Sequence, residues 1–204
     1  MPAPNAVPDA PVRVLAAASR ALERVHCGGW YVFGALAVTI WSRPRMTADV
    51  DITVRLEDVE SFCTAMENEG FALRVQNRHE FLARTRVIPF IHNPTGMPLD
   101  VVLAGPGIED LFLSRAVTVQ LQGLSVPVAS PEDLIVMKIL AGRPKDVEDV
   151  RSLLKDRLST LDLAQIEDLL SLLEQALHQS DLIPVWTREL RAAGLTGSTP
   201  AERG

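Results

Sequence analysis

The amino-acid sequence predicts an α/β or α+β protein in which strands and helices mix over the first two thirds and only helices follow. Three observations lead to this class. Short apolar and β-branched runs bounded by Gly or Pro recur up to residue 129. Helical spacing of apolar residues then continues to about residue 194. Between the two patterns, Ser130-Pro131-Glu132-Asp133 is typical of a helix start, with Ser at the N-cap, Pro after it and acids in the first turn.

Helices are predicted wherever apolar side chains return every three or four positions. In the first, over 11–26, Val12, Leu15 and Leu22 share one face, and Cys27-Gly28-Gly29 ends it. The other expected helices are 35–41, 56–70, 131–141, 144–158, 162–178 and 183–193.

Strands are predicted where short apolar or β-branched runs stand between turn residues. The clearest is Val50-Asp51-Ile52-Thr53-Val54, which carries an acid in its interior. The full set of expected strands is 30–33, 50–54, 71–76, 79–92 (as a hairpin or bent strand), 98–104, 117–121 and 124–128.

These elements predict one mixed core and one helical region between two flexible tails. The tails are expected at residues 1–10 and 195–204, which are rich in Pro and in small or polar residues. The core is expected over 11–129 and the C-terminal helical region over 130–194.

The charge balance argues against a broad nucleic-acid-binding surface. The chain has 20 basic and 26 acidic residues, a formal net charge of −6. Local basic runs at Arg43–Arg45 and Arg74–Arg86 still leave room for a local anionic ligand.

The sequence predicts a cytoplasmic protein with no membrane contact. It has no stretch of roughly 18 uncharged apolar residues, the length that a membrane span needs. The N-terminus lacks the basic start and apolar run of a signal peptide. With only Cys27 and Cys63, a disulfide framework is not expected.

Two common nucleotide-binding motifs and a zinc site are absent from the sequence. There is no Gly-x-x-x-x-Gly-Lys-Ser/Thr loop, and no Gly-x-Gly-x-x-Gly follows a strand. The two cysteines lack the spacing of zinc ligands. The histidines are scattered along the chain, at His26, His79, His92 and His178.

The most informative segment is Thr47-Ala48-Asp49-Val50-Asp51-Ile52. Residues two apart on a strand share a face, so Asp49 and Asp51 are expected to project together, with Val50 and Ile52 on the buried side. Two adjacent carboxylates repel each other unless a cation lies between them, and Mg²⁺ prefers oxygen ligands. The alternative is a strand with one solvated acidic face.

A third acid, Asp100, lies within the apolar run Leu99-Asp100-Val101-Val102-Leu103. An ionised acid there is costly unless it lies at a strand end or binds a cation. If its strand neighbours that of Asp49 and Asp51, three carboxylates converge on one rim. Such a rim suits two-metal phosphoryl transfer, with Asp100 as general base and shared metal ligand.

These residues in this order resemble the signature of the DNA polymerase β-type nucleotidyltransferase superfamily. That signature is a hydrophobic residue, Gly and a small residue, then a spacer and Asp-h-Asp-h, which matches Phe33-Gly34-Ala35 and Asp49-Val50-Asp51-Ile52. Asp100 fits the third acid. The wider run through Arg45 and Thr47 is similar to small prokaryotic nucleotidyltransferases grouped with the AbiEii toxins. So is the later run Ser130-Pro131-Glu132-Asp133, Lys138 and Arg143-x-Lys145-Asp146-x-x-Asp149.

The resemblance implies a polymerase-β-like mixed sheet with flanking helices and a Mg²⁺-dependent nucleotidyltransferase, with two ions expected. The substrate would be a nucleoside triphosphate such as ATP, cradled by Gly34 and Ala35 and neutralised by Lys138. Arg45 and Thr47 would add to this binding site. One departure is Ala35, where Gly or Ser is usual. A backbone N–H remains there, but no hydroxyl.

The acceptor and several side-chain roles stay open at this stage. The resemblance implies a toxin of a toxin–antitoxin pair, acting on tRNA or a protein hydroxyl, with an antitoxin protein as partner. An antibiotic or another small-molecule acceptor is the alternative, and a non-catalytic nucleotide-binding interaction module is an alternative of another class. Arg45 could equally be a solvated loop residue. Lys145 and Asp146 could belong to an ordinary helix start.

Overall fold

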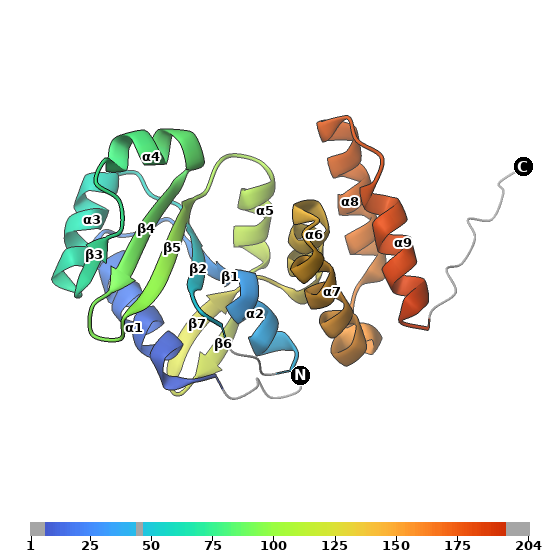
Figure 1. Ribbon diagram of the computed structural model, residues 1–204, viewed down its shortest axis with the longest axis horizontal. Coiled ribbons are helices and arrows are strands. Elements are labelled where there is room, and N and C mark those ends of the chain that lie inside the picture. The colour runs from blue at the N-terminus through green and yellow to red at the C-terminus, as the bar shows by residue number, and fades with distance from the viewer. Residues whose placement is uncertain (1–6, 44–46, 195–204) are drawn as a thin grey trace, which may run out of the picture. The chain divides into compact units, whose positions relative to one another are not determined.

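The computed structural model describes residues 7–43 and 47–194 (Figure 1). The chain divides into two compact units between Ser130 and Pro131. We call them the sheet unit and the helical unit and describe each by itself. Both the mixed sheet and the run of helices that the sequence predicted are present, so the α/β class is confirmed.

The sheet unit is built on one seven-stranded mixed sheet with the order β3-β4-β5-β2-β1-β7-β6. The pairs β2–β5 and β1–β7 are parallel, and the remaining neighbours are antiparallel. The strands are β1 (Trp30–Phe33), β2 (Val50–Val54), β3 (Phe71–Leu73), β4 (Val87–His92), β5 (Met97–Leu103), β6 (Val117–Leu121) and β7 (Leu124–Val128).

Among residues 7–43 and 47–130, five helices accompany this sheet. Two of them, α1 and α3, pack against each other and lie behind the sheet in Figure 1. α2 follows β1 without a loop and packs against β1 and β2. The bounds are α1 (Asp9–Arg24), α2 (Gly34–Trp41), α3 (Val59–Asn68), α4 (Arg78–Thr85) and α5 (Ile108–Arg115).

The expected strand over 79–92 is wrong in its first half, which forms α4. Asn77 caps this helix, because its side chain accepts a hydrogen bond from the backbone N–H of Glu80 at 3.2 Å. Arg86 ends it in the left-handed conformation, with φ 59°, and β4 begins at the next residue. Helix α5, which begins after Gly107, was not among the predicted elements.

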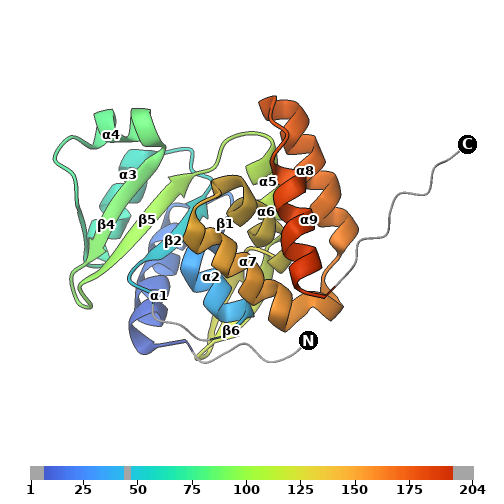
Figure 2. The same ribbon diagram turned by 45° about the vertical axis from the view of Figure 1, so that its right-hand side comes forward.

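The helical unit contains α6 (Pro131–Ala141), α7 (Pro144–Arg157), α8 (Leu163–Leu177) and α9 (Leu182–Ala192), with a short 3₁₀ turn at Leu158–Thr160. Figure 2 shows these four helices from a second direction. α6 packs against α7, α8 and α9, which makes it the central helix. On α8, Ile166, Leu169, Leu170 and Leu173 are buried, whereas Leu177 is 51% exposed. No helix in the described ranges is long and apolar enough to cross a membrane.

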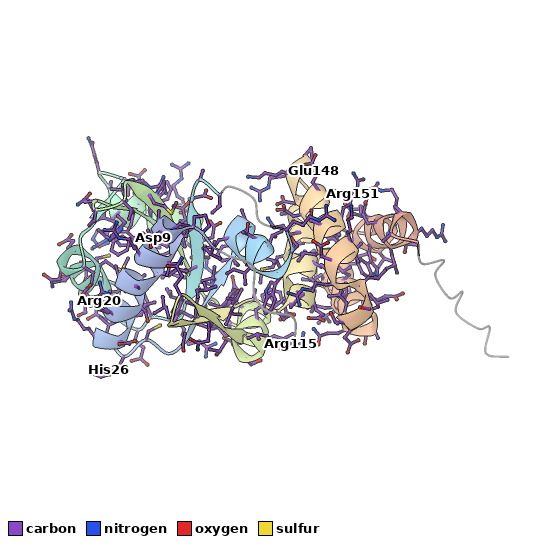
Figure 3. All side chains as sticks on the ribbon, turned by 90° about the horizontal axis from the view of Figure 1, so that it is seen from below. Asp9, Arg20, His26, Arg115, Glu148 and Arg151 are labelled. Atoms are coloured by element: carbon purple, nitrogen blue, oxygen red, sulfur yellow. The ribbon has the colours of Figure 1, made fainter. Side chains whose placement is uncertain are left out.

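The helical unit also buries a carboxylate, that of Glu189 on α9, which is 1% exposed. Arg151, which projects from α7 (Figure 3), donates from Nε to this carboxylate at 2.6 Å. Arg188 Nε donates to it at 2.8 Å. The hydrogen bond from Arg151, together with that from Arg188, lowers the pKa of Glu189 despite its burial.

Candidate active site

A row of paired residues crosses the middle of the sheet and carries two of the predicted acids. Asp51 on β2 is the register partner of Phe33 on β1 and of Asp100 on β5. Asp100 is also the partner of Pro89 on β4, whose carbonyl accepts the backbone N–H of Arg74 at 2.9 Å. Because register partners on neighbouring strands share a face, Asp51 and Asp100 lie side by side on the same face.

The opposite faces of β2 and β5 belong to the core. Asp51 and Asp100 are half-buried, and the side chain of Asp100 is 34% exposed. Their strand neighbours, by contrast, are fully buried, at Val50, Ile52, Leu99 and Val101. The alternation that the sequence predicted is confirmed for Val50 and Ile52, and it leaves the acids on the face that solvent can reach.

Gly34 brings the backbone at the start of α2 against the carboxylate of Asp51. Its φ is +68°, and an added Cβ would lie 2.9 Å from Cγ of Asp51 and closer still to Oδ2. Only glycine fits both this conformation and this close approach. The first N–H groups of a helix lack partners within it and attract anions. At the other end of α2, Trp41 Nε1 anchors the helix by donating to the carbonyl of Ala129 at 2.7 Å.

The other residues of the Asp-x-Asp segment lie at the edge of this site. Asp49 directly precedes β2 and is half-buried. The hydroxyl of Thr47 donates to the carbonyl oxygen of Asp49 at 2.8 Å. Arg45 lies outside the described residues. Ala35 follows Gly34 in the first turn of α2, and its phosphate-binding role stays a prediction.

Of the three predicted acids, Asp51 and Asp100 are the two that the sheet register pairs directly. Within 7–43 and 47–194, no group of three His, Cys, Asp or Glu side chains is arranged to hold a metal ion. The three-ligand role of Asp49, Asp51 and Asp100 therefore stays a prediction. Mg²⁺ in proteins commonly takes one or two carboxylates and completes its shell with water and substrate phosphates. The donor chemistry of Asp51 and Asp100 fits such an ion.

The structure also shows a cation that the sequence analysis did not assign to the site. The guanidinium of Arg74, just beyond β3, forms an ion pair with Oδ1 of Asp100. The signal in the sequence was the basic run that begins at Arg74. Nothing in one sequence shows, however, that β3, β4 and β5 are neighbours and bring Arg74 to Asp100.

Lys138 lies in the helical unit, where it already holds two carboxylates. Its side chain is 8% exposed, and Nζ lies 3.0 Å from Asp146 Oδ1 and 2.8 Å from Asp149 Oδ2. Burial would raise the pKa of Asp146, but hydrogen bonds from Arg143 and Lys138 outweigh it and leave this pKa lowered. Asp146 and Asp149 are thus buried ion-pair partners. Asp146 also lies in the first turn of α7, which agrees with the helix start that the sequence left as an alternative.

Several solved structures are similar to this chain in fold. The antibiotic-resistance factor ANT(2'')-Ia has a TM-score of 0.58 at 14% identity, over 82% of this chain and 92% of its own. An antigenic nucleotidyltransferase-like protein from Paracoccidioides brasiliensis has a TM-score of 0.57 at 18% identity, over 94% of both chains. The lincomycin-bound lincosamide antibiotic adenylyltransferase LnuA has a TM-score of 0.51 at 14% identity, over 73% of this chain and 98% of its own.

These likenesses confirm the nucleotidyltransferase fold that the sequence predicted. No curated protein matches the chain in sequence. The AbiEii-like subtype is not confirmed and stays a prediction. A family model does match, over residues 15–180, and its span includes Gly34, Asp51 and Asp100. The chain therefore belongs to the family described as nucleotidyltransferase of unknown function (DUF6036).

Proposed function

We propose that this protein is a Mg²⁺-dependent enzyme that transfers a nucleoside monophosphate from a nucleoside triphosphate to a hydroxyl group. One observation carries the proposal: in a chain of a nucleotidyltransferase family, Asp51 and Asp100 are register partners, and Asp51 lies against Gly34 at the start of α2. Two carboxylates for a cation and helix N–H groups for phosphate thus occur together.

The site residues would have three roles: triphosphate binding, cation binding and proton transfer. The backbone N–H groups at Gly34 and Ala35 would bind triphosphate oxygens, and Arg45 and Thr47 would add to this binding site. Asp49, Asp51 and Asp100 would hold one or two cations, which when bound neutralise charge on the transferred phosphate and the leaving pyrophosphate. Asp100 would take the proton from the acceptor hydroxyl. The acceptor oxygen then bonds to the α-phosphorus, and the bond from that phosphorus to the pyrophosphate breaks.

The acceptor proposed from the sequence resemblance is a macromolecular hydroxyl. On that hypothesis the protein is the toxin of a toxin–antitoxin pair and modifies tRNA or a protein, and an antitoxin protein would be its partner. A cytoplasmic location would follow from such a role.

A small-molecule acceptor is the second candidate, and two observations favour it. The formal net charge of −6 works against binding a long polyanion such as RNA. Two structures of similar fold are named for antibiotics: ANT(2'')-Ia as an antibiotic-resistance factor and LnuA as a lincosamide antibiotic adenylyltransferase. At 14% identity their acceptors are a guide to which compounds to test.

Calorimetric titration of each nucleoside triphosphate, with Mg²⁺ and with EDTA, tests the core of the proposal. We expect binding that needs the metal and is lost in the Asp49→Asn/Asp51→Asn double variant. Asp168→Asn, an exposed change on α8, is the matched control and should bind as the parent does. No binding of any nucleotide by the parent protein would contradict the proposal and favour a partner-binding module.

Transfer of label from α-³²P-labelled triphosphates then identifies the acceptor class. The candidates are total tRNA, a cell protein extract, and a panel of antibiotics that includes tobramycin and lincomycin. Asp51→Asn should abolish the transfer while leaving the circular dichroism spectrum unchanged. If Asp51→Asn transfers no label but cells that express it respond as they do to the parent protein, the protein acts through a partner without catalysis.

A further inference from the structure

The ion pair between Arg74 and Asp100 joins a fixed positive charge to the acid that we assign as general base. We propose that Arg74 is a positioning residue that competes with the divalent cation for the carboxylate of Asp100. The inference rests on the proposed function, because it concerns the cation of that same site. It adds a residue that neither the family resemblance nor the sequence motifs assign.

Arg74 is held at the level of the two acids by its backbone. Its N–H donates to the carbonyl of Pro89 at 2.9 Å, and Pro89 is the register partner of Asp100. Asp100 is in turn the partner of Asp51. The guanidinium therefore reaches Asp100 from the side opposite Asp51, along one row of the sheet.

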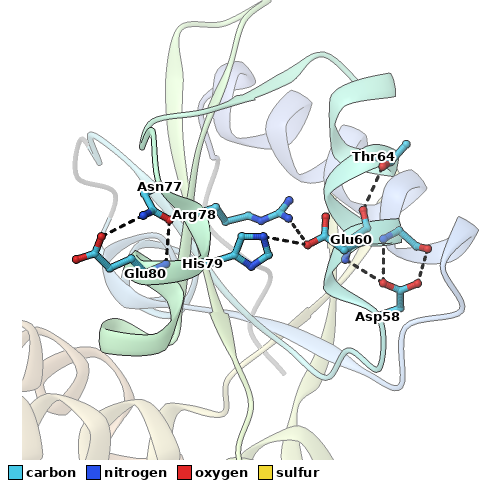
Figure 4. Close-up of polar contacts among 8 residues, drawn as sticks. Asp58, Glu60, Thr64, Asn77, Arg78, His79 and Glu80 are labelled. Atoms are coloured by element: carbon cyan, nitrogen blue, oxygen red, sulfur yellow. Dashed lines mark hydrogen bonds and ion pairs between the residues drawn. The ribbon is translucent and has the colours of Figure 1, made fainter.

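The connection that carries Arg74 is anchored at both of its ends. β3 ends at Leu73, and Asn77 caps α4 four residues later. Figure 4 shows that α4 is tied to α3, because Arg78 and His79 both reach the carboxylate of Glu60. A change at Arg74 itself should therefore leave this backbone in place and alter only the charge beside Asp100.

The ion pair between Arg74 and Asp100 is exposed enough for a cation to replace the guanidinium. The side chains of Arg74 and Asp100 are 37% and 34% exposed, and exposed ion pairs contribute little to stability. An arginine does not lose its proton at any ordinary pH, so its charge leaves Asp100 only when the side chain moves. A divalent cation at Asp100 therefore either displaces the guanidinium or binds beside its positive charge, and both weaken cation binding. Once displaced, this guanidinium has donors free for phosphate oxygens.

Removing the competitor should strengthen cation binding. We expect Arg74→Ala to raise the affinity for Mn²⁺ by about 3- to 10-fold, the range given by losing an exposed pair and one nearby positive charge. Arg74→Lys should fall between the parent and Arg74→Ala. Arg84→Ala removes the same charge from an exposed position on α4 and should leave Mn²⁺ affinity unchanged.

The test is Mn²⁺ titration of the full chain, with free Mn²⁺ followed by electron paramagnetic resonance. In an Asp100→Asn background, Arg74→Ala should have no effect, because the shared carboxylate is gone. Equal or weaker binding by Arg74→Ala, while the parent binds Mn²⁺ and Asp51→Asn does not, would overturn the inference and leave the proposed function standing. Absence of Mn²⁺ binding in the parent and in Arg74→Ala alike would overturn the inference, whereas the proposed function falls only if the nucleotide titration also shows no binding.

Discussion

Replacing Gly34 with alanine should damage the candidate site, and a matched change at Gly96 separates this damage from the backbone penalty. The change adds one methyl group at φ +68°, where it meets the side chain of Asp51. Gly96, in the turn between β4 and β5, has φ +67°, and an added Cβ there would meet nothing within 4 Å. Gly96→Ala therefore carries the same backbone penalty without the contact.

The expected energies follow from these two environments. A left-handed conformation costs an L-residue about 1–2 kcal/mol, and this term is common to both variants. At Gly34 the methyl would also lie 2.9 Å from Cγ and 3.1 Å from Cβ of Asp51, so rotating the carboxylate does not relieve the contact. Such overpacking costs about 1–3 kcal/mol more. We expect Gly34→Ala to lower the free energy of unfolding by about 2–5 kcal/mol, and Gly96→Ala by about 1–2 kcal/mol.

Urea unfolding gives the two stabilities, and calorimetric titration of nucleoside triphosphate gives the effect on the site. Because Asp51 must move, Gly34→Ala should lose at least about tenfold in nucleotide affinity, or roughly 1.4 kcal/mol. Gly96→Ala should keep the affinity of the parent. Equal stabilities for the two variants, together with unchanged nucleotide binding by Gly34→Ala, would refute the close approach of Asp51 to α2 as a feature of the working site.

Three further changes test buried ionisable side chains. Lys138→Met removes the cation between Asp146 and Asp149 and should lower the free energy of unfolding, measured in urea, by about 3–5 kcal/mol. The triple variant Lys138→Met/Asp146→Asn/Asp149→Asn should recover much of that stability. A loss below about 1 kcal/mol in Lys138→Met would contradict the prediction. Burial lowers the pKa of His92 below 6.5, so stability falls as pH drops from 7.5 to 5.5, and His92→Asn should reduce that fall. A fall of the same size in His92→Asn would assign it to other groups. Hydrogen bonding lowers the pKa of Glu189, so Glu189→Gln should cost about 2 kcal/mol at pH 7, and this difference should shrink below pH 4.5.

The sequence predicted those parts of the fold that depend on local pattern. Strand β2 and helix α6 have the predicted bounds because alternation and a strong helix start are local signals. Helix α4 was missed because Phe81 and Leu82 stand among polar residues, and none of its side chains is buried. Its capping pair, Asn77 and Glu80, was the local signal that could have found it.

The candidate site was predictable as a set of residue types but not as an arrangement. The Asp-x-Asp spacing shows that Asp51 faces away from the core, whatever the strand order. Asp51 and Asp100 lie next to each other because β2 and β5 pair in parallel, although about 50 residues of chain separate them. No local pattern in the sequence encodes this pairing. The ion pair of Arg74 depends on the same long-range pairing, carried one strand further.

Arg74 and Lys138 differ in what a phosphate ligand must overcome to recruit them. Lys138 is 8% exposed and holds two buried carboxylates, and separating a buried ion pair costs about 3–5 kcal/mol. Arg74 and its partner Asp100 are each about one third exposed, and such a pair contributes about 0–1 kcal/mol. A bound triphosphate would therefore recruit the guanidinium of Arg74 at much lower cost than the ammonium of Lys138. On this argument Arg74 is the better candidate to neutralise a bound nucleotide, while the charge of Lys138 chiefly holds α6 and α7 together.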